Sequence, residues 1–142
     1  MSVLELSPTT DSVPLARHFA RSELRDSASD LDTVLLLVSE VVTNAVLHAR
    51  SVIRLSVLDQ DGIARVEVHD TSPLLPRPQH FDRMSSTGRG LRMLDRLSLT
   101  WGVEPDHHGR GKVVWFEVGS PTDAMWESFA DGLQAEGAFG DI

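Results

Sequence analysis

The segment from residue 31 to residue 49 constrains the fold most, because its apolar residues recur with the period of a helix. A helix turns by about 100° per residue, so these valines and alanines fall within a single arc. A helix face this apolar must pack against another layer of secondary structure. Because two alternating segments follow directly, we expect that layer to be a β-sheet. The arc consists of Val34, Val38, Val41, Val42, Ala45, Val46 and Ala49.

Alternation of apolar and polar residues predicts the strands of this sheet. Two of the alternating segments lie on either side of Asp61-Gly62, a dipeptide that is typical of a tight hairpin turn. A later pair flanks the stretch EPDHHGRG, which we interpret as a second hairpin loop. The expected strands are 2–6, 53–57, 64–68, about 97–103 and about 112–118.

Helical spacing of apolar residues predicts the remaining elements, with Asp11 or Ser12 capping the first helix and Ser29 or Asp30 capping the long one. The order of helices and strands indicates an α+β fold. We expect a two-layer α/β sandwich, with helices packed on one face of a mixed, mostly antiparallel sheet. The expected helices are about 13–24, 31–49, 91–97 and 121–135.

A chain of 142 residues is most simply one domain, since that length can bury roughly 70% of the surface of the unfolded chain. We expect residues 1–142 to form this domain, with a core at about 13–118. A C-terminal helix and a frayed tail are expected at 121–142.

Charge and composition narrow the range of partners. The net charge of −8 disfavours binding to nucleic acid or to an anionic membrane, because both carry negative charge. The chain contains no cysteine, which excludes disulfides, thiolate zinc sites and cysteine nucleophiles. It begins without a basic segment followed by a long apolar one, so we expect a cytoplasmic protein.

Three polar side chains, Glu40, Asn44 and His48, form a stripe along one edge of the apolar arc. The simplest interpretation is a solvated helix edge. Alternatively, the carboxylate and the amide offer hard oxygen ligands that suit Mg²⁺, and the carboxylate could accept a proton from an attacking hydroxyl. A zinc site is disfavoured, because asparagine is a poor zinc ligand.

The strand at 64–68 continues to Asp70, whose phase places it on the same inward side as Val66 and Val68. An inward carboxylate is costly unless a group hydrogen-bonds to it. A buried partner within the protein or the exocyclic amine of a purine would satisfy it. A turn in which Asp70 binds its own backbone is an equal alternative.

Gly88-Arg89-Gly90 lies directly before a helical segment, so bare backbone N–H groups at that helix start can attract phosphate. A glycine hinge without a ligand is the alternative. The connection from Thr71 to Thr87 contains three prolines and little periodicity, and connections of this length are usually functional or mobile.

Together these motifs resemble the ATP-binding domain shared by gyrase, the Hsp90 chaperones, histidine kinases and MutL, known as the GHKL type. Within that superfamily the sequence is similar to the bacterial anti-sigma-factor kinases. LLLVSEVVTNAVLHA resembles the N-box of the family, and VEVHDTSPLLP resembles its first glycine box. GRGLRMLDRLSLTWGVEPDHHGRGKVVWFEV resembles the second glycine box with the terminal strands.

The resemblance implies a role for each matching residue. Asn44 would coordinate Mg²⁺, which holds the ATP phosphates. Glu40 would be the general base that deprotonates a serine or threonine hydroxyl of a partner protein. Asp70 would accept the amino group of adenine.

The glycine motif and its neighbours would hold the phosphates. The resemblance implies that Gly88, Gly90 and Leu91 bring backbone amides to the phosphates, with Arg89 assisting. The connection Thr71–Thr87 would be the lid over ATP.

Two positions depart from the family pattern: Ser72 stands where a glycine is usual, and Val113 where a hydroxyl residue often supports adenine. The implied function is an ATP- and Mg²⁺-dependent serine/threonine protein kinase that phosphorylates an anti-sigma-factor antagonist. It would also sequester a sigma factor and form a homodimer. The alternative is a non-catalytic module in which ATP stabilises a binding surface, and a domain that binds no nucleotide is a third interpretation.

Overall fold

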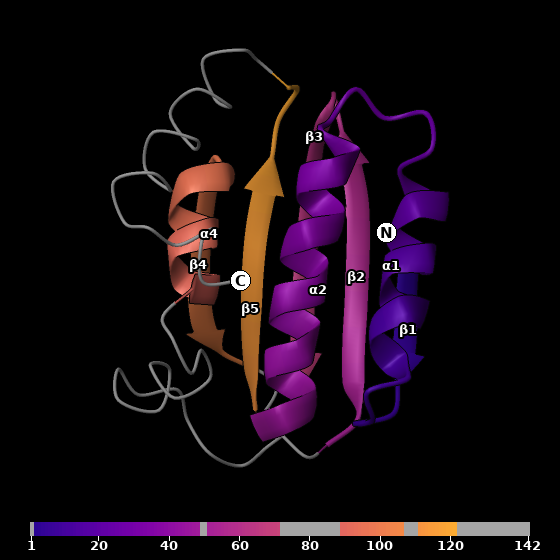
Figure 1. The fold of residues 1–142 in the computed structure, drawn as a ribbon, viewed down its shortest axis with the longest axis vertical. Helices are drawn as coiled ribbons and strands as arrows, with labels where there is room; N and C mark the ends of the chain where they lie inside the picture. Colours follow the sequence, from indigo (N-terminus) through magenta and orange to yellow (C-terminus); the bar gives the residue numbers. More distant parts are fainter. Residues whose placement is uncertain (1, 49–50, 72–88, 107–110, 122–142) are drawn as a thin grey trace, which may run out of the picture.

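The computed structural model describes residues 2–48, 51–71, 89–106 and 111–121. They form one sheet whose helices all lie on the same face (Figure 1). In chain order the elements are β1 (Ser2–Leu6), α1 (Ser12–Glu23), α2 (Leu31–His48), β2 (Ile53–Gln60), β3 (Ile63–Asp70), α4 (Arg89–Leu97), β4 (Thr100–Pro105) and β5 (Lys112–Val118).

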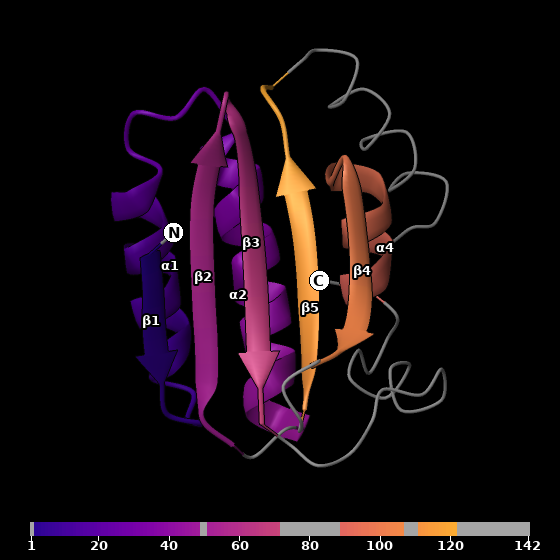
Figure 2. The ribbon, with the colours of Figure 1, turned by 180° about the vertical axis from the view of Figure 1, so that it is seen from behind.

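The five strands are arranged in the order β1-β2-β3-β5-β4, and none of the described helices lies on the face seen from behind, which we call the outer face (Figure 2). Every pairing between these strands is antiparallel. The predicted α+β sandwich is confirmed. The described part of the sheet is purely antiparallel rather than mixed. β2–β3 and β4–β5 are consecutive antiparallel pairs, and two helices between β1 and β2 return the chain so that this pair is antiparallel as well.

The turn between β2 and β3 is the tight hairpin turn that Asp61-Gly62 predicts. Asp61 has a φ angle of 54° and Gly62 a φ angle of 86°. Positive φ at both central residues is the type I′ geometry, which matches the twist of the flanking strands. This turn fixes the register of the hairpin, in which Ile53 at the start of β2 pairs with Asp70 at the end of β3.

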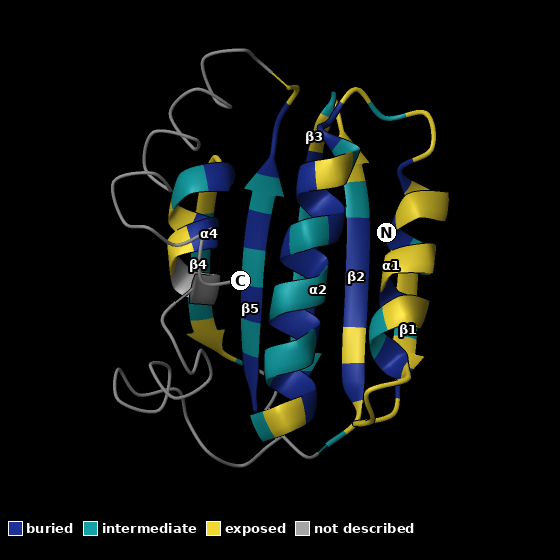
Figure 3. Cartoon of the chain, in the orientation of Figure 1, coloured by how far each residue is buried: buried dark blue, intermediate teal, exposed yellow. Residues whose placement is uncertain are grey.

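Helix α2 forms the centre of the helix layer and contacts α1, α4, β2, β3 and β5. Its predicted apolar arc is buried from Val34 to Val46, and partly buried residues follow along the edge of that arc (Figure 3), while Ala49 lies outside the described residues. By length and composition alone α2 could cross a membrane, but half of it is buried within this structure. Packing on the sheet therefore accounts for its apolar composition.

Local capping contributes to the start of α2. The backbone N–H of Thr33 donates to Asp30 Oδ1 at 3.3 Å, and the Thr33 hydroxyl donates to Asp30 Oδ2 at 2.8 Å. Asp30 therefore caps the N-terminus of α2, and it is one of the two residues predicted to do so. Asp11 occupies the same position at α1 but makes no side-chain capping bond.

Strands β2 and β3 are longer than predicted, and β4 begins later than predicted. Leu97 is the last residue of α4 and is 2% exposed, and β4 begins only at Thr100. The backbone N–H and the hydroxyl of Ser98 both donate to the carbonyl of Leu94, which continues the helical turn through Leu97 to Ser98. The helix expected at 121–135 and the tail lie outside the described residues, apart from residue 121.

Candidate functional site

The candidate site lies at the end of the sheet where α2 ends. Strand β3 finishes there at Asp70, β5 begins beside it at Lys112, and β2 begins at Ile53. Because only residues 49–52 join α2 to β2, the last turn of α2 must lie at this same end, as both ribbon views show (Figures 1 and 2).

The predicted inward orientation of Asp70 is confirmed, and the residue is 3% exposed. One of its partners is Lys112, whose Nζ donates to Asp70 Oδ2 at 2.6 Å. Lys112 is 1% exposed, so both charges are almost completely removed from water. A buried charge without a partner would be strongly destabilising, which makes each residue dependent on the other.

A glycine allows these two strands to approach closely. Gly111 has a φ angle of +97°, and a Cβ built on it would lie 1.9 Å from the backbone oxygen of Asp70. No other residue fits this position without moving the end of β3 away from the start of β5. Gly111 thus places Lys112 in register with Asp70.

The chain just beyond Asp70 is also fixed. The backbone N–H of Thr71 donates to the Ser51 hydroxyl at 3.0 Å, which ties the exit of β3 to the entry of β2. Ile53 and Val114, next to the ion pair on the same face of the sheet, are buried and apolar. The backbone of Asp70 is therefore held by β2 on one side and by β5 on the other.

Glu40 and Asn44 lie about two turns and one turn before the end of α2. Both side chains are partly buried, and Glu40 has an interaction partner within the protein. Within the ranges that the structure describes, no group of three or more His, Asp or Glu residues is placed to hold a metal. Mg²⁺ does not require such a group, since one protein oxygen with phosphates and waters can hold it.

The phosphate-binding residues are only partly described. Helix α4 begins at Arg89, so Arg89 and Gly90 form its first turn, two residues earlier than the predicted start at Leu91. Gly88, the side chains of Arg89 and Leu91, and the lid from Ser72 onward lie outside the described residues. α4 lies beside α2 and contacts it.

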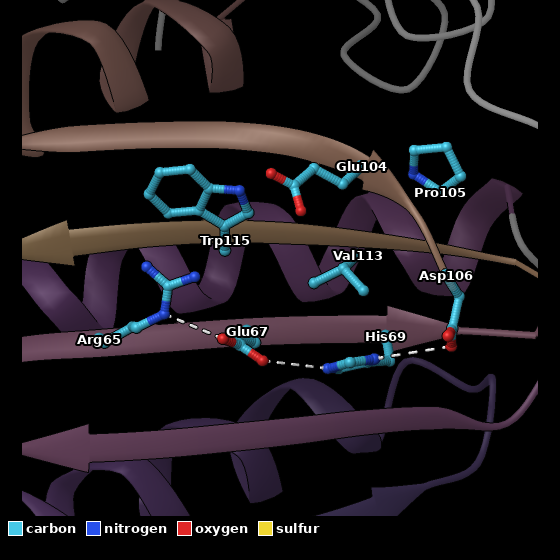
Figure 4. Close-up of a pocket in the computed structure, with 8 residues that line it drawn as sticks. All are labelled: Arg65, Glu67, His69, Glu104, Pro105, Asp106, Val113 and Trp115. Carbon is cyan, nitrogen blue, oxygen red and sulfur yellow. Dashed lines mark hydrogen bonds and ion pairs between the residues drawn. The ribbon is translucent and has the colours of Figure 1, made fainter. Parts of the chain in front are cut away.

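The expected importance of position 113 is wrong. Since Lys112 pairs with Asp70 on the helix face of the sheet, the next residue, Val113, must point to the opposite face. There it lines a hollow of about 210 Å³ on the outer face of the sheet, opposite the described helices (Figure 4). A hydroxyl at 113 would not reach Asp70, and the residue that does reach it is Lys112.

That outer hollow is lined by a charged network around Trp115. Arg65 binds Glu67 at 2.9 Å and Glu117 at 3.3 Å, and its guanidinium lies 4.5 Å from the centre of the Trp115 ring. Burial lowers the pKa of Arg65, but its hydrogen bonds and the charges of the two glutamates outweigh burial and raise the pKa overall. His69 lies 3.3 Å from Glu67 within the same network (Figure 4).

Lys112 is the residue of the candidate site that the sequence analysis missed. The signal was present, because alternation over 112–118 places Lys112, Val114 and Phe116 on one side, as Asp70 is placed with Val66 and Val68. A lysine in that inward phase, opposite an inward aspartate, predicts an ion pair once the two strands are known to be neighbours.

The comparisons with known proteins agree with this architecture. The family model of the histidine kinase-like ATPase domain matches residues 6–118, which include every described helix and all of the sheet except most of β1. A search of curated proteins found no match to the chain.

Proposed function

Because the chain belongs to the histidine kinase-like ATPase domain family, we propose that it binds ATP with Mg²⁺ and is a serine/threonine protein kinase of the anti-sigma-factor type. Its protein substrate would be a small antagonist protein, and a sigma factor would be a second partner. It would act in the cytoplasm, without contacting nucleic acid or membrane itself.

The observation that carries this proposal is the buried carboxylate of Asp70 at the sheet end where α2 finishes. An ionised carboxylate only accepts hydrogen bonds, so it suits an amino group such as that of adenine. The fixed backbone around it, with Gly111 on one side and Ser51 on the other, suits recognition of a rigid planar group.

The residues on α2 would supply the remaining functions. The side-chain oxygen of Asn44 would bind Mg²⁺, and the bound ion would neutralise charge on the phosphates during transfer. Glu40 would accept the proton of a serine or threonine hydroxyl as its oxygen forms a bond to the γ-phosphorus. The bond between that phosphorus and the bridging oxygen breaks, ADP leaves, and the partner carries the phosphate.

Radiolabelled ATP and the protein that co-purifies with the chain in ATP and Mg²⁺ provide the test. The wild-type chain should transfer label to that protein, and the label should survive acid, as phosphoserine does and phosphohistidine does not. Glu40→Gln should abolish transfer while ATP still protects the chain against unfolding, and Asn44→Ala should remove the Mg²⁺ dependence of that protection.

Asp32→Asn is the matched control, because Asp32 is an exposed carboxylate on the same helix and lies outside the proposed site. It should transfer label as the wild type does. Full transfer by Glu40→Gln would show that the assigned base is wrong. Absence of thermal stabilisation by ATP and Mg²⁺ would overturn nucleotide binding, since ligand at 100 times its dissociation constant adds about 2.7 kcal/mol.

Ser72-Pro73, in place of the usual glycine, favours a second candidate, a module that binds ATP without catalysis. In that case ATP would stabilise the chain and alter partner binding, but no label would reach the partner. The same experiment therefore separates the two functions.

A further inference from the structure

Helix α4 is the shortest of the described helices, with nine residues. Isolated helices of fewer than about 12 residues are marginal in water, so the position of α4 depends on its contacts with the rest of the chain. Its apolar residues Met93, Leu94 and Leu97 are buried in the core. Apolar burial is non-directional, so it holds α4 on the sheet without by itself fixing the direction of the helix axis.

The direction of α4 turns its first turn toward the candidate site. Only two residues separate the end of α4 from Thr100 at the start of β4, and Thr100 pairs with Glu117 at the end of β5 that lies far from Asp70. The helix lies alongside β4, so its N-terminal end points back toward the sheet end that holds Asp70 (Figures 1 and 2). This first turn is where the resemblance to the family places the ATP phosphates.

One of the interactions of Trp101 joins the C-terminal half of α4 to the sheet. Trp101 Nε1 donates to Asp95 Oδ1 at 2.6 Å. Trp101 pairs with Phe116, which is fully buried in the core, so the indole lies on the same face of the sheet as α4. A short bond from a rigid ring to a carboxylate is directional, unlike the apolar contacts of the helix. It can therefore fix the angle at which α4 crosses the sheet.

We infer that the hydrogen bond from Trp101 to Asp95 holds α4 at the angle at which its first turn meets the phosphates of ATP, so that both are positioning residues for nucleotide binding. The inference rests on the proposed function, in which the chain binds ATP. Neither side chain needs to touch the nucleotide. Asp95 lies six residues after Arg89, about 9 Å along the axis, so a tilt at Asp95 displaces the first turn.

Loss of this bond should weaken the binding of the phosphates and leave the binding of the base unchanged. A site that is correctly assembled for only part of the time binds with an affinity reduced by that fraction. One hydrogen bond to a charged group can change such a population by about tenfold, so the affinity for ATP should fall by about 5- to 10-fold. Adenosine carries no phosphate, so its affinity should change by less than about twofold.

Displacement of a fluorescent ATP analogue from the full chain measures the affinities for ATP with Mg²⁺ and for adenosine. Trp101→Phe and Asp95→Ala remove the same bond from its two ends, and each should lower the preference for ATP over adenosine by about 5- to 10-fold. The double variant should lose no more than either single variant, because the two changes remove one shared interaction. Asp95→Asn keeps an acceptor oxygen and should retain most of the preference.

Trp115→Phe is the matched control. Trp115 lies on the neighbouring strand β5 but on the outer face, and its Nε1 has no hydrogen-bond partner within the part of the chain that the structure describes. This variant should bind both ligands as the wild type does. An unchanged preference in Trp101→Phe and Asp95→Ala, or an equal fall in affinity for both ligands, would overturn the inference. If the wild type binds neither ligand, the proposed function fails instead, so the two failures are distinguishable.

A measurement on the unmodified chain provides a second test. If the bond favours the placement of α4 that binds ATP, bound ATP must favour the bond by the same factor. Exchange of the Trp101 indole proton with solvent, followed by NMR and assigned by its loss in Trp101→Phe, should slow by about 5- to 10-fold with ATP and Mg²⁺. Adenosine should leave it unchanged. An exchange rate that saturating ATP does not alter would contradict the coupling between this bond and the phosphates.

Discussion

Replacement of Gly111 by alanine tests the close approach of β3 and β5 at the candidate site. Two costs arise from the structure. First, the φ angle of +97° is unfavourable for any residue with a Cβ, which costs about 1–2 kcal/mol. Second, the new methyl group would lie 1.9 Å from the backbone oxygen of Asp70, so one strand must move by about 1 Å or more to reach even a 3.0 Å contact.

That movement acts on the buried ion pair. Lys112 follows Gly111 directly, and its contact with Asp70 is only 2.6 Å long, so a displaced strand end stretches or breaks this bond. Removal of one partner from a buried pair costs about 3–5 kcal/mol. We expect Gly111→Ala to lose at least about 3 kcal/mol of unfolding free energy beyond the cost of the φ angle, which is a large part of the stability of a typical domain.

Gly62→Ala isolates the backbone cost. Gly62 also has a positive φ angle, +86°, but a Cβ there would meet only Ala28 Cβ at an ordinary contact distance of 3.4 Å. Urea denaturation of both variants gives the difference directly. If Gly111→Ala is no less stable than Gly62→Ala, the proposed close packing at Asp70 is incorrect and the strand ends are free to separate.

Three further variants test other parts of the structure. Gly102→Ala places a Cβ 2.8 Å from Trp115 Nε1 and should cost about 1–3 kcal/mol with a changed tryptophan emission, whereas unchanged emission and stability would contradict this packing. Arg65→Met should cost about 1 kcal/mol at low salt and less at high salt, because its ion pairs are partly exposed; a loss that does not depend on salt would show that screening plays no part. Asp30→Ala should cost about 1 kcal/mol by urea denaturation through loss of the α2 cap, and an equal cost for the exposed Asp32→Ala would argue against capping.

Local sequence determined much of this fold. The valine and alanine arc of α2, the Asp61-Gly62 turn and the alternation of the strands each depend on neighbours within a few residues. The inward orientation of Asp70 also follows from strand phase alone, and the structure confirms it. The start of β4 was predicted wrongly because Leu97 and Leu99 fit a strand pattern as well as the end of a helix.

The candidate site depended on tertiary structure. Asp70 and Lys112 are 42 residues apart, and no local pattern indicates that β3 and β5 are neighbours with β4 outside them. That order also shows that Val113 faces away from Asp70. The phase of a side chain is set by the geometry of its own strand, whereas its partner is set by which strands pair and in what register. The sequence alone therefore predicted that the carboxylate of Asp70 lies inside the protein. Only the order and register of the strands show that Lys112 forms an ion pair with it.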